Sequence, residues 1–146
     1  MKGFGQLCDK MDEVEFGYLR RVLRVRKSDE FTGADLLSSE DLEAIILQFD
    51  HLTVQIVAKG LDDTVELHFD QATPWRDPAR HVLSDSAPWR SVVGMRLIGA
   101  WAMTNDRGYS DALQLEFAEQ ERSVATDVRI QLEAAASMFR FYRVID

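Results

Sequence analysis

The chain has 146 residues, of which 46% are hydrophobic and 29% charged, the size and composition of one globular domain over residues 1–146. Its formal net charge of −8 argues against binding to nucleic acid or to anionic lipid. The single cysteine, Cys8, excludes an intramolecular disulfide, and the sequence shows no signal peptide and no apolar run of about 18 residues. We therefore expect a cytoplasmic protein without a membrane span.

The first part of the chain predicts a helix, a strand and a loop. Apolar residues spaced i, i+3, i+4 and i+7 predict a short helix over Phe4–Met11. The segment Glu13–Arg26 alternates in a strand-like pattern. The polar stretch Lys27–Ser39 predicts a long loop with one helical turn near Ala34–Leu37.

The middle of the chain predicts an antiparallel meander and an irregular connection. Short apolar runs separated by polar turns predict three strands, Ala44–Phe49, Thr53–Ala58 and Thr64–Phe69. The segment Gln71–Asp85 contains two prolines and is predicted to be irregular. Ser86 is expected to cap a short helix over Ala87–Val93, with Pro88 in its first turn and Gly94 at its end.

The segment Met95–Phe117 has the best-defined pattern and predicts a hairpin. Its turn, residues 105–108, combines Asn and Asp, which bond their own backbone, with a glycine that accepts a positive φ. The incoming strand carries few polar residues, so we expect a central strand covered on both faces. The outgoing strand alternates, with Leu113, Leu115 and Phe117 expected to face the core.

Two further strands are predicted on either side of the alanines at 134–136, over Asp127–Glu133 and Met138–Ile145. Ala112–Phe117 repeats the length and the terminal Phe of Ala44–Phe49, which indicates two four-strand units in halves 13–70 and 95–145. Chance similarity between amphipathic strands is the alternative. The predicted fold class is α+β, mainly antiparallel β, with about eight strands and one or two short helices in a sandwich or a curved sheet.

The hairpin and its flanks also carry a family resemblance. The residues concerned are Pro88, Trp89, Gly94, Leu97, Ala100, Trp101, Met103–Asn105, Gly108, Tyr109, Asp111–Phe117, Ile130–Leu132, Ala136 and Ser137. With this pattern the chain resembles a family of small bacterial domains of unknown function, over roughly Glu43–Val144. The resemblance implies no established activity and transfers no catalytic residue. As a class, small acidic domains are also similar to the immunity proteins that bacteria pair with secreted toxins.

One predicted strand places three potential metal ligands on one face. Glu66, His68 and Asp70 alternate with apolar residues, and a histidine between carboxylates can bind a metal or transfer a proton. The alternative is a solvated outer face. Because the spacing matches no metal-binding signature, we assign no metal and no cofactor.

The only basic cluster lies at the end of the first predicted strand, and it comprises Arg20, Arg21, Arg24, Arg26 and Lys27. Such a cluster can bind phosphate or a carboxylate-rich partner. The alternative is cross-strand pairing with acids such as Glu43 or Glu66, and the acidic total charge favours this alternative.

Aromatic and acidic side chains in the less regular segments are candidates for partner binding. Two Pro-Trp-Arg tripeptides flank the central connection, and Trp and Arg are frequent hot-spot residues of interfaces. The alternative is that both indoles anchor the connection on the core. Acids can attract a basic partner or serve solubility alone. The candidates are Asp29, Glu30, Glu40, Asp41, Trp75, Arg76 and Trp89.

The sequence contains no catalytic or phosphate-binding motif, so we expect a protein-binding module rather than an enzyme. Its most concrete form is an immunity- or antitoxin-like inhibitor of a basic toxin or effector. One alternative is a small-molecule-binding or enzymatic domain whose pocket lies between the halves, lined by Arg24, His68, Trp101 and Tyr109. Another is a structural or oligomerising subunit, such as a homodimer. The functional surface is expected in Lys27–Asp41 and Gln71–Trp89, with the hairpin as scaffold.

Overall fold

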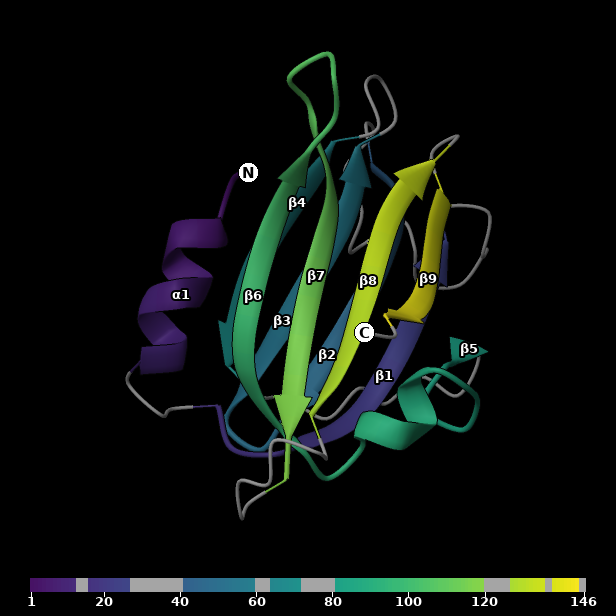
Figure 1. The fold of residues 1–146 in the computed structure, drawn as a ribbon. Coiled ribbons are helices and arrows are strands. Elements are labelled where there is room, and N and C mark those ends of the chain that lie inside the picture. The colour runs from purple at the N-terminus through teal and green to yellow at the C-terminus, as the bar shows by residue number, and fades with distance from the viewer. Residues whose placement is uncertain are drawn as a thin grey trace.

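Two antiparallel sheets and one α-helix make up most of the described part of the chain (Figure 1). The computed structural model describes residues 1–12, 16–26, 41–59, 64–71, 81–119, 127–135 and 138–144. In chain order its elements are α1 (Phe4–Asp12), β1 (Leu19–Arg26), β2 (Asp41–Phe49), β3 (Leu52–Lys59), β4 (Val65–Gln71), β5 (His81–Val82), the 3₁₀ helix η1 (Trp89–Val92), β6 (Arg96–Thr104), β7 (Ser110–Ala118), β8 (Val128–Ala135) and β9 (Met138–Val144). The predicted α+β class and the N-terminal helix are confirmed.

The first sheet has the strand order β4-β3-β2-β1-β5. β2 to β4 form the predicted antiparallel meander, and β1 extends it by pairing with β2. β1 covers the later part of the predicted strand Glu13–Arg26. β5 corrects the prediction that Gln71–Asp85 is irregular throughout, because His81 and Val82 pair with the middle of β1. Two residues are too few to show a periodicity, so the sequence pattern carries no sign of this strand. The predicted loop Lys27–Ser39 lies outside the described residues.

The second sheet is another antiparallel meander, with the order β6-β7-β8-β9, and it confirms the predicted hairpin. In the turn, Asn105 Oδ1 accepts hydrogen bonds from the backbone N–H groups of Arg107, at 2.9 Å, and Tyr109, at 3.1 Å. Gly108 has a φ of +86°, a value that residues with side chains rarely adopt. β8 runs through Ala135, beyond its predicted end. Each sheet therefore contains a four-strand meander, as predicted.

β6 is an edge strand, which corrects the prediction that it is central and covered on both faces. Leu97 is buried and Ala100 packs against the core, but the strand is exposed from Trp101 to Thr104. The cause is a difference in length, because the end of the hairpin projects beyond the other sheet (Figure 1). Even Ala102, which pairs with the core residue Leu113, is exposed there. An apolar run shows only that a strand is able to be buried. Whether it is buried depends on how far the facing sheet extends over it.

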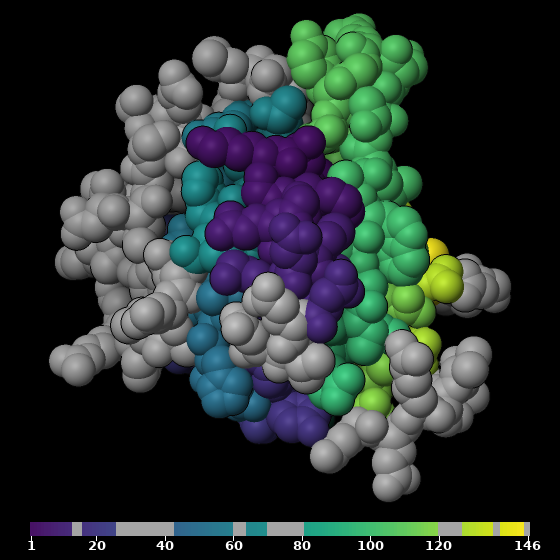
Figure 2. Space-filling model, turned by 90° about the vertical axis from the view of Figure 1, so that its left-hand side faces the viewer, coloured from purple at the N-terminus to yellow at the C-terminus, as the bar shows by residue number. Residues whose placement is uncertain are grey.

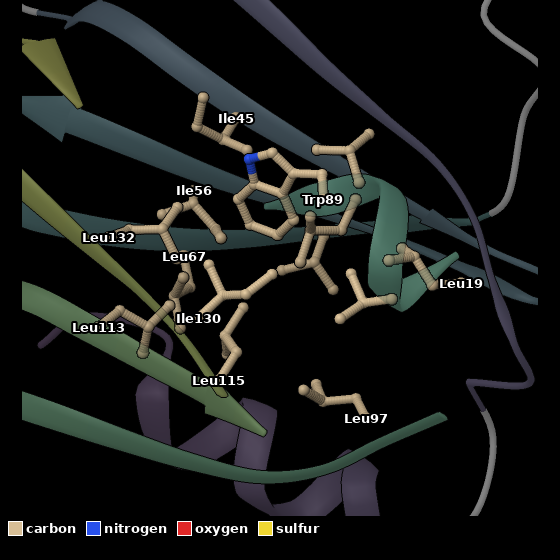
Figure 3. Packing of buried hydrophobic residues seen from close by; sticks show 14 of the residues in the cluster. Leu19, Ile45, Ile56, Leu67, Trp89, Leu97, Leu113, Leu115, Ile130 and Leu132 are labelled. Carbon is tan, nitrogen blue, oxygen red and sulfur yellow. The ribbon is translucent and has the colours of Figure 1, made fainter. Parts of the chain in front are cut away.

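The two sheets pack face to face around one hydrophobic core (Figures 1 and 3), so the sandwich is the correct one of the two predicted arrangements. The first sheet contributes Ile45, Ile56 and Leu67, and the second contributes Leu113, Leu115, Ile130 and Leu132. Each of these side chains is at most 2% exposed, and burial of one stabilises the fold by roughly 1.5–3 kcal/mol. A smaller buried cluster occupies the other face of the first sheet, with Leu23, Val25, Ala44, Ile46 and Val57.

Different elements close the two open sides of the sandwich. Along β4 and β6, α1 lies between the sheet edges (Figure 2). It buries Leu7, and the preceding Lys2 carbonyl accepts a hydrogen bond from the N–H of Leu67 at 2.9 Å. On the other side, η1 inserts Trp89 between the sheets (Figure 3). In the described part of the chain, no helix combines the length and the apolar character that crossing a membrane requires.

The predicted helix over Ala87–Val93 is a single 3₁₀ turn, Trp89–Val92. Ser86 does not cap it, because its hydroxyl donates to a preceding backbone carbonyl at 3.4 Å, and Pro88 holds the N-cap position without a side-chain hydrogen bond. Gly94, with a φ of +85°, follows the turn as predicted. One turn is enough to bury both apolar side chains of η1.

Asp50 joins the turn between β2 and β3 to the start of β1. Its carboxylate accepts hydrogen bonds from the Tyr18 N–H, at 2.9 Å, and from Arg20 Nε, at 2.5 Å. The hydrogen bond from Arg20, followed by that from Tyr18, lowers the pKa of Asp50 below its ordinary value of 3.8. Gly17, with a φ of +75°, has no room for a Cβ, which would lie 2.6 Å from Asp50 Cβ.

The lowered pKa of Asp50 predicts a pH-dependent contribution to stability. The ionised carboxylate stabilises the fold fully above pH 3.8, and this contribution is lost as the pH falls through the lower folded-state pKa. We expect Asp50→Asn to be less stable than the wild type at about pH 6, with a difference that shrinks below the ordinary pKa. Urea unfolding between about pH 6 and pH 3 measures it. Asp106→Asn, in the exposed hairpin turn, is the control, and an equal pH-dependent difference there contradicts the assignment.

Candidate functional site

The candidate site is the face of the second sheet that points away from the core, here called the outer face. Figure 1 shows this sheet in front, with α1 beside it rather than across it. Because side chains alternate along each strand, the register places one set of residues together on this face. The set is Gly99, Trp101, Met103, Ala112, Gln114, Glu116, Arg129, Gln131, Glu133, Met138, Arg140, Tyr142 and Val144.

Large apolar side chains are exposed along both margins of the outer face. β6 presents Trp101 and Met103, and β9 presents Met138 and Tyr142, each between 38% and 48% exposed. In the described residues only Tyr109, in the adjacent hairpin turn, and Val93 are comparably exposed large hydrophobic residues. Scattered exposed apolar residues are common, whereas here they stand in two pairs on the two edge strands of one sheet face.

The centre of the outer face is polar and internally hydrogen-bonded. Gln131 is only 8% exposed, and its Nε2 donates to Glu133 Oε1 at 2.8 Å and to the Tyr142 hydroxyl at 2.7 Å. The Tyr142 hydroxyl in turn donates to Glu133 Oε1 at 2.6 Å. This last hydrogen bond is the main cause that raises the pKa of Tyr142 above its ordinary value of 10.0. The network holds the Tyr142 ring in one position.

Trp101 is also held in place. A Cβ at Gly99 would lie 3.0 Å from the Trp101 ring, so the glycine makes room for the indole beside it on the same strand. The Arg129 guanidinium lies 5.6 Å from the Trp101 ring centroid and pairs with Glu116 at 3.5 Å. The outer face thus combines fixed aromatic rings and flexible thioethers with amide and carboxylate groups. Groups of these kinds are common in protein interfaces.

A family model described as "Family of unknown function (DUF6334)" matches residues 6–146. The chain belongs to this family. The DUF6334 match extends from α1 through both sheets and confirms the resemblance to a family of unknown function that the hairpin residues carry. No curated protein and no solved structure gives a significant match. Membership therefore brings no activity with it, and function has to be argued from the site.

The predicted metal candidates lie on β4, away from the outer face. His68 Nε2 is 3.4 Å from Glu66 Oε2, and Lys59 Nζ is 3.5 Å from the same oxygen. The side chain of Asp70 lies outside the described residues. Among the side chains that the structure describes, no group of three metal-ligating residues comes together. Glu66 thus shares its carboxylate with a lysine, as expected on a solvated face.

The basic cluster of β1 follows the cross-strand interpretation. Arg20 pairs with Asp50 at 2.5 Å, and Arg24 pairs with the predicted Glu43 at 2.7 Å. Arg21 makes no ion pair with the residues that the structure describes, while Lys27 and the side chain of Arg26 lie outside them. Two of the arginines therefore serve the fold.

Most of the predicted partner-binding residues lie outside the described residues, namely Asp29, Glu30, Glu40, Trp75 and Arg76. Asp41 begins β2, and its side chain is not described. Trp89 is fully buried and therefore lies out of reach of a partner, which corrects its place among the binding candidates. The structure supports the alternative interpretation of this tryptophan as a core anchor.

The four residues proposed to line a pocket between the halves do not come together. Trp101 lies on the outer face, Tyr109 in the hairpin turn and His68 on β4, while Arg24 is bound to Glu43 beside β9. Met103, Met138 and Tyr142 were missed by sequence reasoning. The signal for them was present, since Met138 and Tyr142 share the solvent-facing parity of their strand.

Proposed function

We propose that the chain is a protein-binding module that docks a basic protein partner on the outer face. The observation that carries the proposal is the exposure of Trp101, Met103, Met138 and Tyr142 on one sheet face that no described helix or strand covers. Aromatic residues and methionine are enriched in protein interfaces.

Charge supports a basic partner. The chain carries a formal net charge of −8, which steers a positively charged protein towards it. On the outer face, Glu116 is paired with Arg129, but the hydrogen bonds to Glu133 come from the neutral Gln131 and Tyr142. Arg140, the cross-strand neighbour of Glu133 on the same face, makes no ion pair with the described residues. The two acids and two arginines of the face balance, so the attraction of a basic partner comes from the total charge, and an arginine or lysine of the partner would pair with Glu133.

Within this class, we favour an immunity- or antitoxin-like inhibitor that covers the active surface of a bacterial toxin or effector. The restrained positions of Trp101 and Tyr142 support this role, because a preorganised surface loses little conformational entropy on binding. A rigid sheet face blocks a partner's active site by contact alone.

The size of the outer face indicates how far the contact extends. Four strands about 4.8 Å apart, with about 3.3 Å per residue along them, give a footprint of roughly 15 by 25 Å. This is about half of the roughly 800 Å² that each partner contributes to a standard interface. The projecting hairpin turn, where Tyr109 is exposed, extends the same surface (Figures 1 and 2).

A Trp101→Asp substitution tests the docking surface. Wild-type protein on a resin is expected to capture a basic protein from a lysate of the source cells, identified by mass spectrometry. With that protein purified, calorimetry should show that Trp101→Asp weakens binding by at least about 2 kcal/mol, roughly 30-fold in Kd. Excess wild-type protein should also inhibit the activity of the captured protein.

The matched control is Val93→Asp, which places the same charge at an exposed apolar site outside the outer face. It should bind as the wild type does. Equal binding by Trp101→Asp and Val93→Asp contradicts the proposal. Sedimentation at several concentrations addresses the homodimer alternative, and dimerisation abolished by Trp101→Asp would make a second copy of the chain the partner.

A further inference from the structure

A second candidate site lies on the opposite side of β9 from Tyr142. The segment before η1, η1 itself and Arg143 line an open surface hollow of about 570 Å³, within the size range of small-molecule sites. The side chains that matter for its chemistry are Asp85, Ser86, Pro88, Arg90, Ser91 and Arg143. Neighbouring side chains alternate along a strand, so Arg143 faces away from the outer face. The hollow is therefore separate from the proposed docking surface.

The two arginines carry the strong hydrogen-bond donors of the hollow. Ser86 Oγ donates to the carbonyl of Leu83, and Ser91 Oγ donates to that of Pro88, so both hydroxyl protons are engaged within the chain. Arg90 and Arg143 make no ion pair in the part of the chain that the structure describes. Arg20, Arg24 and Arg129 pair with carboxylates, whereas Arg21, Arg96, Arg107 and Arg140 make no ion pair with the described residues either. What distinguishes Arg90 and Arg143 is that both line this hollow.

We propose that this hollow binds a small organic anion through a carboxylate or phosphate group held by Arg90 and Arg143. Each guanidinium offers several N–H donors in a fixed plane, which matches the oxygens of either group. Pro88, with the neighbouring Ala87, supplies an apolar wall for the body of the ligand. A bare ion would fill only a small part of the volume, so an anion with a carbon skeleton is the better fit.

Asp85 sets a limit on the ligand. Its carboxylate lies on the lining of the same hollow and repels a second negative charge placed next to it. The site therefore favours a ligand whose negative charge is gathered at one end over one that is charged along its length. The inference is independent of the docking surface and does not rest on the proposed function.

An NMR titration of the full chain tests the site. Phenyl phosphate and benzoate are the anionic probes, benzyl alcohol is the neutral one, and the salt is kept at about 0.15 M, where the Debye length is about 8 Å. We expect saturable shifts of the backbone N–H signals of residues 85–87 and 89–91 with an anionic probe and none with benzyl alcohol. The tighter of the two anionic probes identifies the preferred group.

Substitutions test whether Arg90 and Arg143 bind the anionic probe. Arg90→Gln and Arg143→Gln should each weaken binding about tenfold, and Asp85→Asn should strengthen it. Arg107→Gln, at the exposed hairpin turn, removes the same charge and should leave the affinity unchanged. Because the two hollow arginines are exposed and make no described ion pair, their variants should keep the fold, which a thermal melt verifies. No saturable shift, or an equal loss with Arg107→Gln, overturns the inference.

Discussion

Glu43→Ala is expected to lower the free energy of unfolding by about 3–5 kcal/mol, the loss typical when one partner of a buried ion pair is removed. Glu43 is 1% exposed and binds groups from both sheets. One carboxylate oxygen lies 2.7 Å from Arg24 Nε of β1, and the other accepts the N–H of Phe139 in β9 at 2.5 Å. The alanine variant would leave a largely buried cation and a buried N–H without an acceptor.

The same pair protects an edge strand. β9 is the last strand of its sheet, and the N–H and C=O of Phe139 point outward from it. Glu43 accepts from that N–H, and Arg24 Nη2 donates to that carbonyl at 3.3 Å, so both groups are occupied. An unoccupied edge invites pairing with another chain. We therefore expect the variant to aggregate more readily during urea unfolding.

The control for this prediction is Glu66→Ala, which breaks a partly exposed contact with Lys59 and should cost less than about 1 kcal/mol. The double variant Arg24→Met, Glu43→Leu removes both charges. Its loss of unfolding free energy should be larger than that of Glu66→Ala and smaller than that of Glu43→Ala, because only the backbone groups of Phe139 then lack partners. If Glu43→Ala costs no more than Glu66→Ala in urea unfolding, the buried pair does not contribute as argued.

The local pattern of the sequence was enough to predict the strands of both meanders and the hairpin. Alternation predicts strands, and Asn105 with Gly108 predicts the turn, because these signals depend only on neighbouring residues. The sequence also named Glu43 as one possible cross-strand partner of the basic cluster, and Arg24 is the arginine that pairs with it.

Long-range contacts set the limit of prediction. Period-two alternation gives two faces but does not say which one is covered, so β6 was placed at the centre although it lies at an edge. The contact between Glu43 and the Phe139 N–H spans 96 positions, and no local signal announces it. For the same reason the hairpin was expected to be scaffold, while its Trp101 belongs to the proposed docking surface.

Trp89→Ala is expected to cost about 3–5 kcal/mol of the free energy of unfolding, as for other large core aromatics. Trp89 is fully buried between the sheets, close to Ile45 and Ile56 (Figure 3). Its ring centroid lies 5.7 Å from that of Phe141 on β9. Alanine would leave a cavity where η1 closes the sandwich, and the flanking sheets can fill it only in part.

Trp89→Phe separates the size of the side chain from its polar group. The indole Nε1 of Trp89 has no hydrogen-bond partner among the described residues, so a phenyl ring forfeits volume but no hydrogen bond. In urea unfolding, Trp89→Phe should therefore lose less than half of the unfolding free energy that Trp89→Ala loses. An equal loss of unfolding free energy for Trp89→Ala and Trp89→Phe would mean that the exact shape of the indole, rather than the volume it fills, stabilises the side of the sandwich that η1 closes.

Trp101→Ala completes the comparison, because its indole is 44% exposed and should change stability by less than about 1 kcal/mol. The two tryptophans then predict opposite outcomes. Trp89 variants unfold more easily and still bind the partner while folded, whereas Trp101 variants stay folded and fail to bind. The division follows from topology, since η1 directs Trp89 into the core and an edge strand presents Trp101 to solvent.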